Sequence, residues 1–179
     1  MAGVLPFYYD HSKKQFYYII ARESPTHPTA ANEYSDFGGS KDGSESKLET
    51  ACRECYEESM GFFGKQHNIK KNISHLPTHM QLSIKSYTSY LMYVPEGLHL
   101  DMFMNRHFDF IKAKAPDIIN DNTNCIYEKD HFVSVNLEQL NTKYNDKLRR
   151  FYRGLIPQID ETKIYDYIFP HGTSLHDSF

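Results

Sequence analysis

Two runs of apolar and aromatic residues near the start of the chain predict a β-hairpin. Val4 to Tyr9 and Phe16 to Ala21 are both rich in residue types that favour strands. A short polar turn that begins at Asp10 separates them, so we expect the two strands to pair. The next stretch, Arg22 to Asn32, contains two prolines and no periodicity, which predicts a loop. An extended piece from Tyr34 to Phe37 then leads to a pair of glycines.

The segment after the glycine pair has the polar and apolar spacing of a helix, which we place at about Ser46 to Met60. At about 100° per residue, the helix has a small and weakly apolar face on one side and glutamates on another. The apolar face consists of Leu48, Cys52, Cys55 and Ser59. A serine is suited to cap the N-terminus, and either Ser44 or Ser46 has the right position.

The second half of the chain predicts further strands and helices. Gln81 to Val94 is β-branched and aromatic, which indicates one long strand or two short ones, and His131 to Asn136 indicates another. Apolar spacing predicts helices over Met102 to Lys114 and over Asn145 to Ile156. The apolar face of the later helix consists of Leu148, Phe151, Tyr152 and Leu155.

The remaining segments are polar and lack periodicity, so we expect them to be connections. Gly64 to His79 is predicted to contain one short helical turn, and Pro116 to Asn124 is predicted to be a loop. Leu137 to Leu140 is expected to form a turn, and the tail after Pro157 is expected to be partly frayed.

Strands that flank a central helix, with more helices outside them, indicate an α/β (α+β) fold with a mixed sheet. The chain has 179 residues, of which 40% are apolar, so it is long enough for a real core. It shows no repeat, low-complexity segment or linker. We therefore predict a single domain that spans residues 1–179.

Net charge and cysteine content exclude several classes of protein. The formal net charge of −3 argues against a strongly basic nucleic-acid-binding surface. No apolar run approaches the roughly 20 residues of a membrane span, so we expect no membrane contact. The three cysteines are sparse, and Cys52 and Cys55 lie on the apolar side of the predicted helix, where buried thiols are expected. A reducing, cytoplasmic location fits these features.

Carboxylates are concentrated on the predicted helix beyond what a solvated face needs. Glu54, Glu57 and Glu58 fall within about 100° of one another. Glu54 and Glu58 repel each other by about 0.2–0.5 kcal/mol, and Arg53 offsets part of this repulsion beside Glu57. Clustered carboxylates next to a glycine turn, with an arginine that can hold one of them, favour a site for a hard cation such as Mg²⁺.

The spacing of these residues resembles the Nudix box of the Nudix hydrolases. Gly39 is followed after five residues by Glu45, and after seven more by the run Arg53-Glu54-Cys55-Tyr56-Glu57-Glu58. Every charged position of that pattern is present. The chain departs from the pattern at one point, because two residues and not one precede Gly61. That extra residue follows the carboxylates, and Gly61 still suits a left-handed helix cap.

The resemblance implies a mixed sheet between helices, and a hydrolase that uses Mg²⁺, with Mn²⁺ as an alternative. Water would attack phosphorus in a nucleoside diphosphate linked to a second moiety. The implied metal ligands are the Gly38 carbonyl, Glu54, Glu57 and Glu58. Arg53 is expected to orient Glu57, and Glu45 to steady the loop.

Other roles are left open by the sequence. The general base is Glu54 within the box or Glu128 outside it, and Glu128 also fits an ordinary exposed loop residue. Arg22 and Lys41 are candidates to bind substrate phosphates, although single basic residues on loops are commonly just solvated.

The substrate class also has alternatives. A small nucleotide is expected, of the dinucleoside polyphosphate, ADP-ribose or nucleotide sugar type. The first alternative is an mRNA-decapping enzyme in which the basic run from Lys147 to Arg153 guides capped RNA, although the acidic net charge counts against it. The second is a non-catalytic, nucleotide-sensing module, which is expected to have lost box glutamates that this chain keeps. A homodimer is left open.

Overall fold

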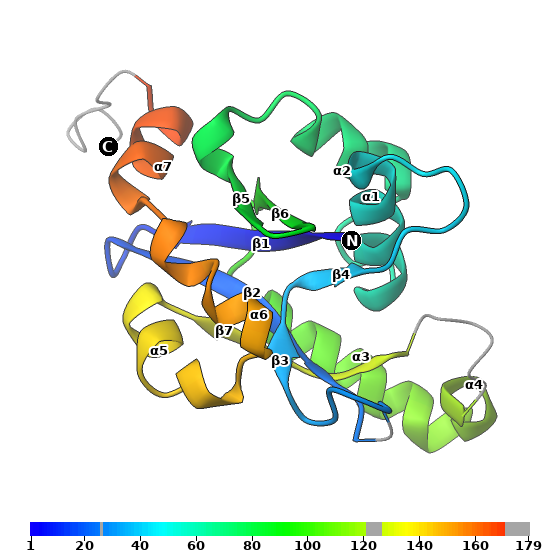
Figure 1. Cartoon of the computed structure of the whole chain (residues 1–179). Helices are drawn as coiled ribbons and strands as arrows, with labels where there is room; N and C mark the ends of the chain where they lie inside the picture. The colour runs from blue at the N-terminus through cyan, green and yellow to red at the C-terminus, as the bar shows by residue number, and fades with distance from the viewer. Residues whose placement is uncertain (26, 121–126, 171–179) are drawn as a thin grey trace.

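The computed structural model of the protein describes residues 1–25, 27–120 and 127–170 (Figure 1). Its strands are β1 (Ala2–Asp10), β2 (Gln15–Glu23), β3 (Tyr34–Ser35), β4 (Phe37–Gly39), β5 (Gln81–Ile84), β6 (Tyr87–Tyr93) and β7 (Lys129–Val135). Its α-helices are α1 (Lys47–Glu58), α2 (Gln66–Ile73), α3 (Leu100–Lys114), α4 (Pro116–Asn120), α5 (Leu137–Asn141), α6 (Arg150–Arg153) and α7 (Glu161–Ile168). Short 3₁₀ helices are η1 (Thr78–Met80), η2 (Asn145–Lys147) and η3 (Ile156–Gln158).

The strands form one mixed sheet with β1 near its centre. β1 pairs antiparallel with β2 and β4, and parallel with β6. β2 pairs antiparallel with β3 and β7, and β5 pairs antiparallel with β6. The predicted hairpin is thus confirmed, and of the two alternatives for Gln81 to Val94 the structure has two short strands. Because β1 lies near the centre of a sheet whose two faces are both covered, almost all of its side chains are buried.

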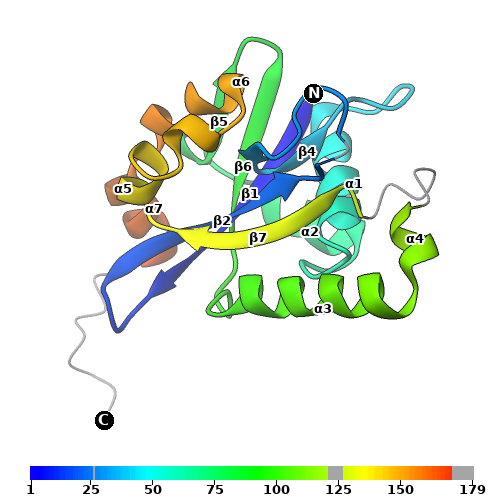
Figure 2. The same ribbon diagram turned by 90° about the horizontal axis from the view of Figure 1, so that it is seen from below.

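Helices cover both faces of this sheet, as predicted. Figure 2 shows α1, α2 and α3 on one side of the sheet and α5, α6 and α7 on the other. Helix α1 packs against β1 and β4, α3 packs against β7, and α5 contacts β2. Because α1 meets the sheet at β4, its carboxylates lie beside the glycine pair that ends this strand.

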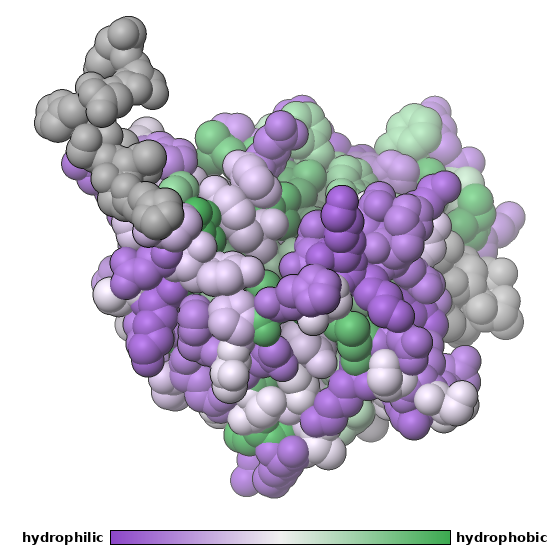
Figure 3. Space-filling model, turned by 90° about the horizontal axis from the view of Figure 1, so that it is seen from above, coloured by the Kyte–Doolittle hydropathy of each residue, from purple (hydrophilic) through white to green (hydrophobic). Residues whose placement is uncertain are grey.

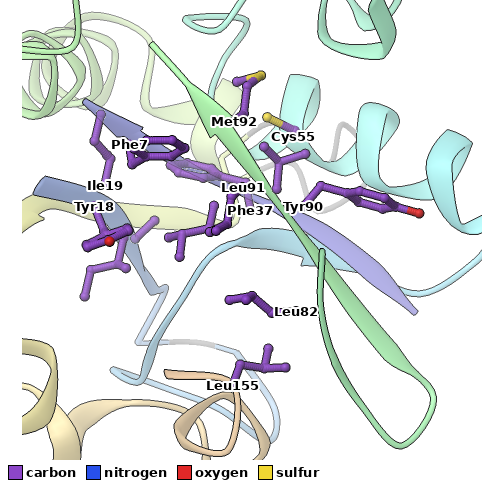
Figure 4. Packing of buried hydrophobic residues seen from close by; sticks show 14 of the residues in the cluster. Phe7, Tyr18, Ile19, Phe37, Cys55, Leu82, Tyr90, Leu91, Met92 and Leu155 are labelled. Carbon is purple, nitrogen blue, oxygen red and sulfur yellow. The ribbon is translucent and has the colours of Figure 1, made fainter. Parts of the chain in front are cut away.

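The core fills the space between the central strands and their helices. Phe7 and Ile19 are fully buried in it, and Figure 4 shows Cys55 of α1 beside Leu91. Cys52 and Cys55 are buried free thiols, which confirms that prediction. Cys125 lies outside the described residues.

The prediction of a continuous helix from Asn145 to Ile156 was wrong. Leu148 forms an isolated parallel bridge with Tyr34, and the Arg149 N–H donates to the Tyr34 carbonyl at 2.9 Å. This pairing takes the backbone out of the helical conformation between η2 and α6. The guanidinium of Arg153 donates to the freed carbonyls of Leu148 and Asp146, at 3.0 and 2.9 Å. The apolar residues of this segment are nonetheless buried or half-buried.

Several segments predicted to be connections contain helices. Helix α2 buries Ile69 and Ile73, which is more than the single helical turn expected there. Helix α4 occupies the start of the predicted loop at Pro116, and residues 121–124 of that loop lie outside the described residues. Helices α5 and α7 replace a predicted turn and part of a predicted frayed tail. Side chains of Asn136 and Asp160 cap their N-termini, and such caps stabilise helices too short to show periodicity.

One side chain covers the outer edge of the sheet at β5. The Ser83 N–H donates to Gln158 Oε1 at 3.0 Å, and Gln158 Nε2 donates to the Ser83 carbonyl, also at 3.0 Å. Gln158 belongs to η3, so this primary amide occupies the place that a neighbouring strand would take.

The face of the molecule drawn in Figure 3 is largely polar. Hydrophilic residues cover most of the face in Figure 3, with apolar residues in scattered patches. Among the described residues, no helix has both the length and the apolar character that a membrane crossing requires.

Candidate functional site

Helix α1 begins with a capping box that fixes the start of the site. The Ser46 hydroxyl accepts a hydrogen bond from the Glu49 N–H at 3.2 Å, and the Glu49 carboxylate accepts one from the Ser46 N–H at 2.9 Å. This arrangement satisfies two backbone donors at the helix N-terminus. Ser46 is therefore the cap, one of the two serines that the sequence left open.

The helix ends in two successive left-handed residues. Met60 has a φ of 55° and Gly61 has a φ of 75°, and the Gly61 N–H donates to the Tyr56 carbonyl at 2.9 Å. Gly61 thus has the left-handed conformation that the sequence predicted for it. The extra residue of the box lengthens this exit and lies after the carboxylates, on the C-terminal side of Glu58.

Arg53 holds three glutamates together at the surface of the molecule. Its guanidinium lies 2.9 Å from Glu45 Oε1, 2.9 Å from Glu54 Oε1 and 2.9 Å from Glu57 Oε2. It also donates to the Ser40 carbonyl at 2.8 Å, which ties the glycine loop to the helix. We call Arg53, Glu45, Glu54 and Glu57 the Arg53 cluster. A planar fork with five donors suits this divided role, which a lysine could not fill.

Two carboxylate oxygens of this cluster are not used by the protein. Arg53 binds Oε1 of Glu54 and Oε2 of Glu57. Within residues 1–25, 27–120 and 127–170, no hydrogen-bond donor reaches the other oxygen of either carboxylate. The side chains are 12% and 21% exposed, so water and ions reach them. Both are thus oriented and still able to accept a ligand.

The glycine pair lies directly against these carboxylates. A Cβ atom at Gly39 would lie 2.5 Å from Glu54 Oε1, so any side chain there would displace the carboxylate. The Gly38 N–H donates to Glu58 Oε2 at 2.7 Å. Because the N–H and C=O of one strand residue point the same way, the Gly38 carbonyl also faces the carboxylates of α1.

A second group of charges is buried below the first. The Lys129 ammonium contacts Glu23 Oε1, the Ser35 hydroxyl at 3.1 Å and Glu58 Oε1 at 3.2 Å. Arg149 reaches Glu23 Oε1 at 3.1 Å. We call Lys129, Glu23 and Glu58 the Lys129 cluster, and each of these residues is at most 3% exposed. Lysine is almost never fully buried unless it is paired, as it is here.

The ionisation of Glu54 reflects its partly buried position. Burial raises the pKa of this carboxyl to about 7, and Arg53 opposes that rise. The negative charges of Glu57 and Glu128 raise the pKa further. Glu128 itself is exposed just before β7, with its carbonyl accepting the Ser24 N–H at 2.9 Å. Its effect on Glu54 places Glu128 near the box.

Burial affects the ionisation of Glu58 more strongly than that of Glu54. Burial raises its pKa well above the ordinary value, and the Lys129 ammonium lowers it. Neighbouring carboxylates, among them Glu128, raise it as well. For Lys129, burial lowers the pKa, but Glu58 and Glu23 outweigh this and raise it above the ordinary value. The lysine is therefore a cation at neutral pH.

The donor set fits a hard divalent cation. All nearby ligand atoms are oxygens, and carboxylates outnumber the cations Arg53, Lys129 and Arg149. In the described part of the chain, no three His, Cys, Asp or Glu side chains form a ready-made metal site. Mg²⁺ does not need such a cage, since it commonly uses one or two carboxylates, waters and substrate phosphates. Glu54, Glu57 and the Gly38 carbonyl could hold it.

Two other predicted site residues, Arg22 and Lys41, differ in whether their charge is already paired with another described residue. Arg22 forms a two-pronged ion pair with Asp130, at 2.8 and 3.0 Å, so its charge is already used. Lys41 is exposed on the loop between β4 and α1. The residues brought together around the end of β4 are Gly38, Glu45, Arg53, Glu54, Glu57 and Glu58.

Sequence reasoning missed three charged residues under the site. Lys129, Glu23 and Asp36 are all buried, and Asp36 accepts hydrogen bonds from the hydroxyls of Tyr87 and Ser89. Burial raises the pKa of Asp36 to about 6. The only signal was a charged residue at or beside the end of a strand, and that pattern is too common to be informative.

Comparison with known proteins gives structural neighbours alone. No protein-family model matches the sequence, and no curated protein matches it. An Ap4A hydrolase from C. elegans is similar in structure with a TM-score of 0.53 and 11% identity, over 91% of this chain and 96% of that one. A Nudix hydrolase from M. smegmatis (12% identity, 91% and 84% covered) and a MutT protein from Methanosarcina mazei (17%, 91% and 94%) each have a TM-score of 0.48.

At these identities the likeness bears on the fold. The Ap4A hydrolase and this chain share their architecture over nearly their whole lengths. The mixed sheet between helices agrees with that likeness. The chain therefore has the Nudix fold.

Proposed function

We propose that the protein is a Mg²⁺-dependent pyrophosphohydrolase that cleaves a nucleoside diphosphate linked to a second moiety. One observation carries the proposal: Glu54 and Glu57 are oriented by Arg53, and each keeps an oxygen that no described donor uses. Carboxylates that are held in place and keep an accessible oxygen are suited to bind a divalent ion. The Nudix fold and the intact box support the same reaction.

A bound divalent ion would neutralise charge on the pyrophosphate and lower the pKa of a coordinated water. The chain's own residues supply the rest. Arg53 fixes the two ligand carboxylates relative to each other and to the loop, through the Ser40 carbonyl. Gly39 allows the backbone to approach Glu54 closely, which brings the loop between β4 and α1 next to the carboxylates.

Two carboxylates are suited to accept the proton of the attacking water. Glu54 has a pKa of about 7, which matches a base that acts near neutral pH. Glu128 is exposed and lies near enough to raise the pKa of Glu54. The choice between them stays a prediction, as do the roles of Glu58 as a ligand and of Lys41 with substrate phosphates. The paired guanidinium of Arg22 makes it a weaker candidate for that second role.

The substrate is proposed at the level of its class. Dinucleoside polyphosphates, ADP-ribose and nucleotide sugars share the phosphoric anhydride that this site would cleave. The structurally similar C. elegans protein is an Ap4A hydrolase, so dinucleoside polyphosphates are the first substrates to test. The cytoplasmic location, the use of Mn²⁺ and a homodimer stay predictions.

The test is a hydrolysis panel with Mg²⁺ and with Mn²⁺. Dinucleoside polyphosphates, ADP-ribose, nucleotide sugars and capped RNA are offered to wild type and to Glu57→Gln. We expect one nucleotide to be hydrolysed and Glu57→Gln to lower kcat/KM at least about 100-fold, as losses in a metal's coordination shells do. The matched control is Glu49→Gln on the same helix, because glutamine preserves a capping box.

The outcomes separate the alternatives. Hydrolysis of capped RNA alone would favour the decapping enzyme. Tight nucleotide binding without turnover of any compound would favour the sensing module and contradict the proposal. Equal loss of activity in both glutamine variants would show that charge on α1 in general matters, and not the ligand position.

A further inference from the structure

Glu58 differs from the other box glutamates in how its oxygens are used. Oε2 accepts the Gly38 N–H at 2.7 Å, and Oε1 contacts the Lys129 ammonium at 3.2 Å. The residue is 3% exposed, so neither oxygen is presented to water. A divalent ion at Glu58 would have to compete with a lysine that is already in place.

Lys129 is built into the fold and cannot easily move away from Glu58. It is the first residue of β7 and pairs with Glu23 of β2, at an irregularity between Arg22 and Glu23. Its three ammonium protons meet three partners, namely Glu23, Ser35 and Glu58. Removal of the ammonium would leave the buried Glu58 carboxylate without a counterion, which is strongly unfavourable.

Charge counts divide the site into two parts. In the Arg53 cluster, three carboxylates face one guanidinium, so the cluster has a net charge of −2 when ionised. In the Lys129 cluster together with Arg149, two carboxylates face two cations, so the net charge is zero. One divalent ion balances the first part, and the second part needs none.

We propose that Lys129 is a resident cation of the site: its ammonium neutralises Glu58 and Glu23, so that divalent ions bind at Glu54 and Glu57 and not at Glu58. This inference rests on the divalent-ion site of the proposed function and revises the ligand set predicted from the box. In this arrangement Lys129 is a positioning residue. It holds Glu58, and Glu58 holds the Gly38 peptide, so the Gly38 carbonyl stays directed at the divalent ion.

The experiment measures Mn²⁺ binding without substrate, by electron paramagnetic resonance of the free ion. Wild type is expected to bind one Mn²⁺ per chain. Glu58→Gln is expected to bind it within about twofold of the wild-type affinity, whereas Glu57→Gln is expected to weaken it at least tenfold. Lys129→Met is expected to gain a second Mn²⁺, because Glu58 then lacks its counterion and Glu23 keeps only Arg149.

Two further variants complete the series. Lys47→Met removes an exposed lysine at the start of α1, where Nζ bonds the Thr88 hydroxyl at 2.9 Å, and should leave the count at one. The double variant Lys129→Met/Glu58→Gln removes both members of the buried pair and should lose the second ion. If Lys129→Met does not fold, the contrast between Glu58→Gln and Glu57→Gln in the presence of Lys129 still decides the matter.

Two results would overturn the inference: loss of Mn²⁺ in Glu58→Gln to the extent seen in Glu57→Gln, or a folded Lys129→Met that binds a single ion as wild type does. Absence of Mn²⁺ binding in wild type would instead remove the metal site of the proposed function. Binding in the expected pattern without hydrolysis of any substrate would retain the inference and contradict the enzyme.

Discussion

The Arg53 cluster and the Lys129 cluster use similar residues in opposite ways. Each joins glutamates, at least one of them on α1, to a single basic side chain. Arg53 is 20% exposed and leaves one oxygen of Glu54 and one of Glu57 unused. Lys129 is fully buried, and it and the Gly38 N–H together engage both oxygens of Glu58. The first cluster can bind a ligand, and the second holds the protein together beneath it.

The difference follows from helix geometry. Glu57 and Glu58 are adjacent in sequence, so their side chains leave the helix about 100° apart. That rotation brings Glu57 to the surface and Glu58 under β4, where Lys129 approaches from β7. Three glutamates of one motif therefore do not form one equivalent set of ligands. Their roles depend on which other elements meet that side of the helix.

The largest expected effect is on stability, at the Lys129 cluster. Lys129→Met should lower the free energy of unfolding by about 3–5 kcal/mol in metal-free buffer, because it leaves a buried charge uncompensated. Chemical denaturation with EDTA present measures this change. Lys129→Met/Glu58→Gln should recover part of the loss. A Lys129→Met protein as stable as wild type would show that the buried pair contributes no net stability.

A smaller stability effect and a larger activity effect are expected at the Arg53 cluster. Arg53→Met should lower the free energy of unfolding by about 1–2 kcal/mol, since its partners remain partly solvated and keep water as an alternative. Activity should fall about 10–100-fold, as for other residues that orient metal ligands. Denaturation curves and kcat/KM are measured on the same preparation. A stability loss as great as that of Lys129→Met would contradict the contrast between the clusters.

A further expected effect is a pH dependence of the metal-free protein. Burial raises the pKa of Glu54 to about 7, so the folded state keeps this proton after the unfolded state has lost it. Stability from this group is therefore full below about pH 4.5 and declines as pH rises towards 7. Thermal unfolding between pH 5 and 8 in EDTA should show the decline, and Mn²⁺ should reduce it.

Glu54→Gln is the control for that profile. The buried Asp36 carboxyl, with a pKa of about 6, contributes a decline of the same sign in wild type and variant alike. Only the difference between the two profiles belongs to Glu54. Identical slopes in wild type and Glu54→Gln would show that this carboxyl does not titrate as described.

The sequence was informative where the signal is local. Strand composition predicted the central strands, and the serine cap and the spacing of the glutamates predicted α1. It was uninformative where the local structure depends on pairing with a residue far away in the sequence. Leu148 has helical spacing but pairs with Tyr34, more than a hundred residues earlier, and no local pattern reveals that bridge.

The same limit applies to the candidate site. The box residues could be located because they lie within one helix and its preceding loop. Lys129 could not, because its importance arises only when β7 pairs with β2 and brings it under α1. Its neighbour Glu128 is a candidate base by position alone, and its charge is a small contribution to the raised pKa values of Glu54 and Glu58.

The Gln158 amide at Ser83 has a consequence for colloidal behaviour. An exposed edge strand is a template on which other chains can add strands and grow into fibres. A primary amide that occupies both the donor and the acceptor of Ser83 interrupts such growth at the middle of β5. Concentrated solutions of the protein should therefore resist fibrillation, and this resistance resides in a residue that belongs to neither charged cluster.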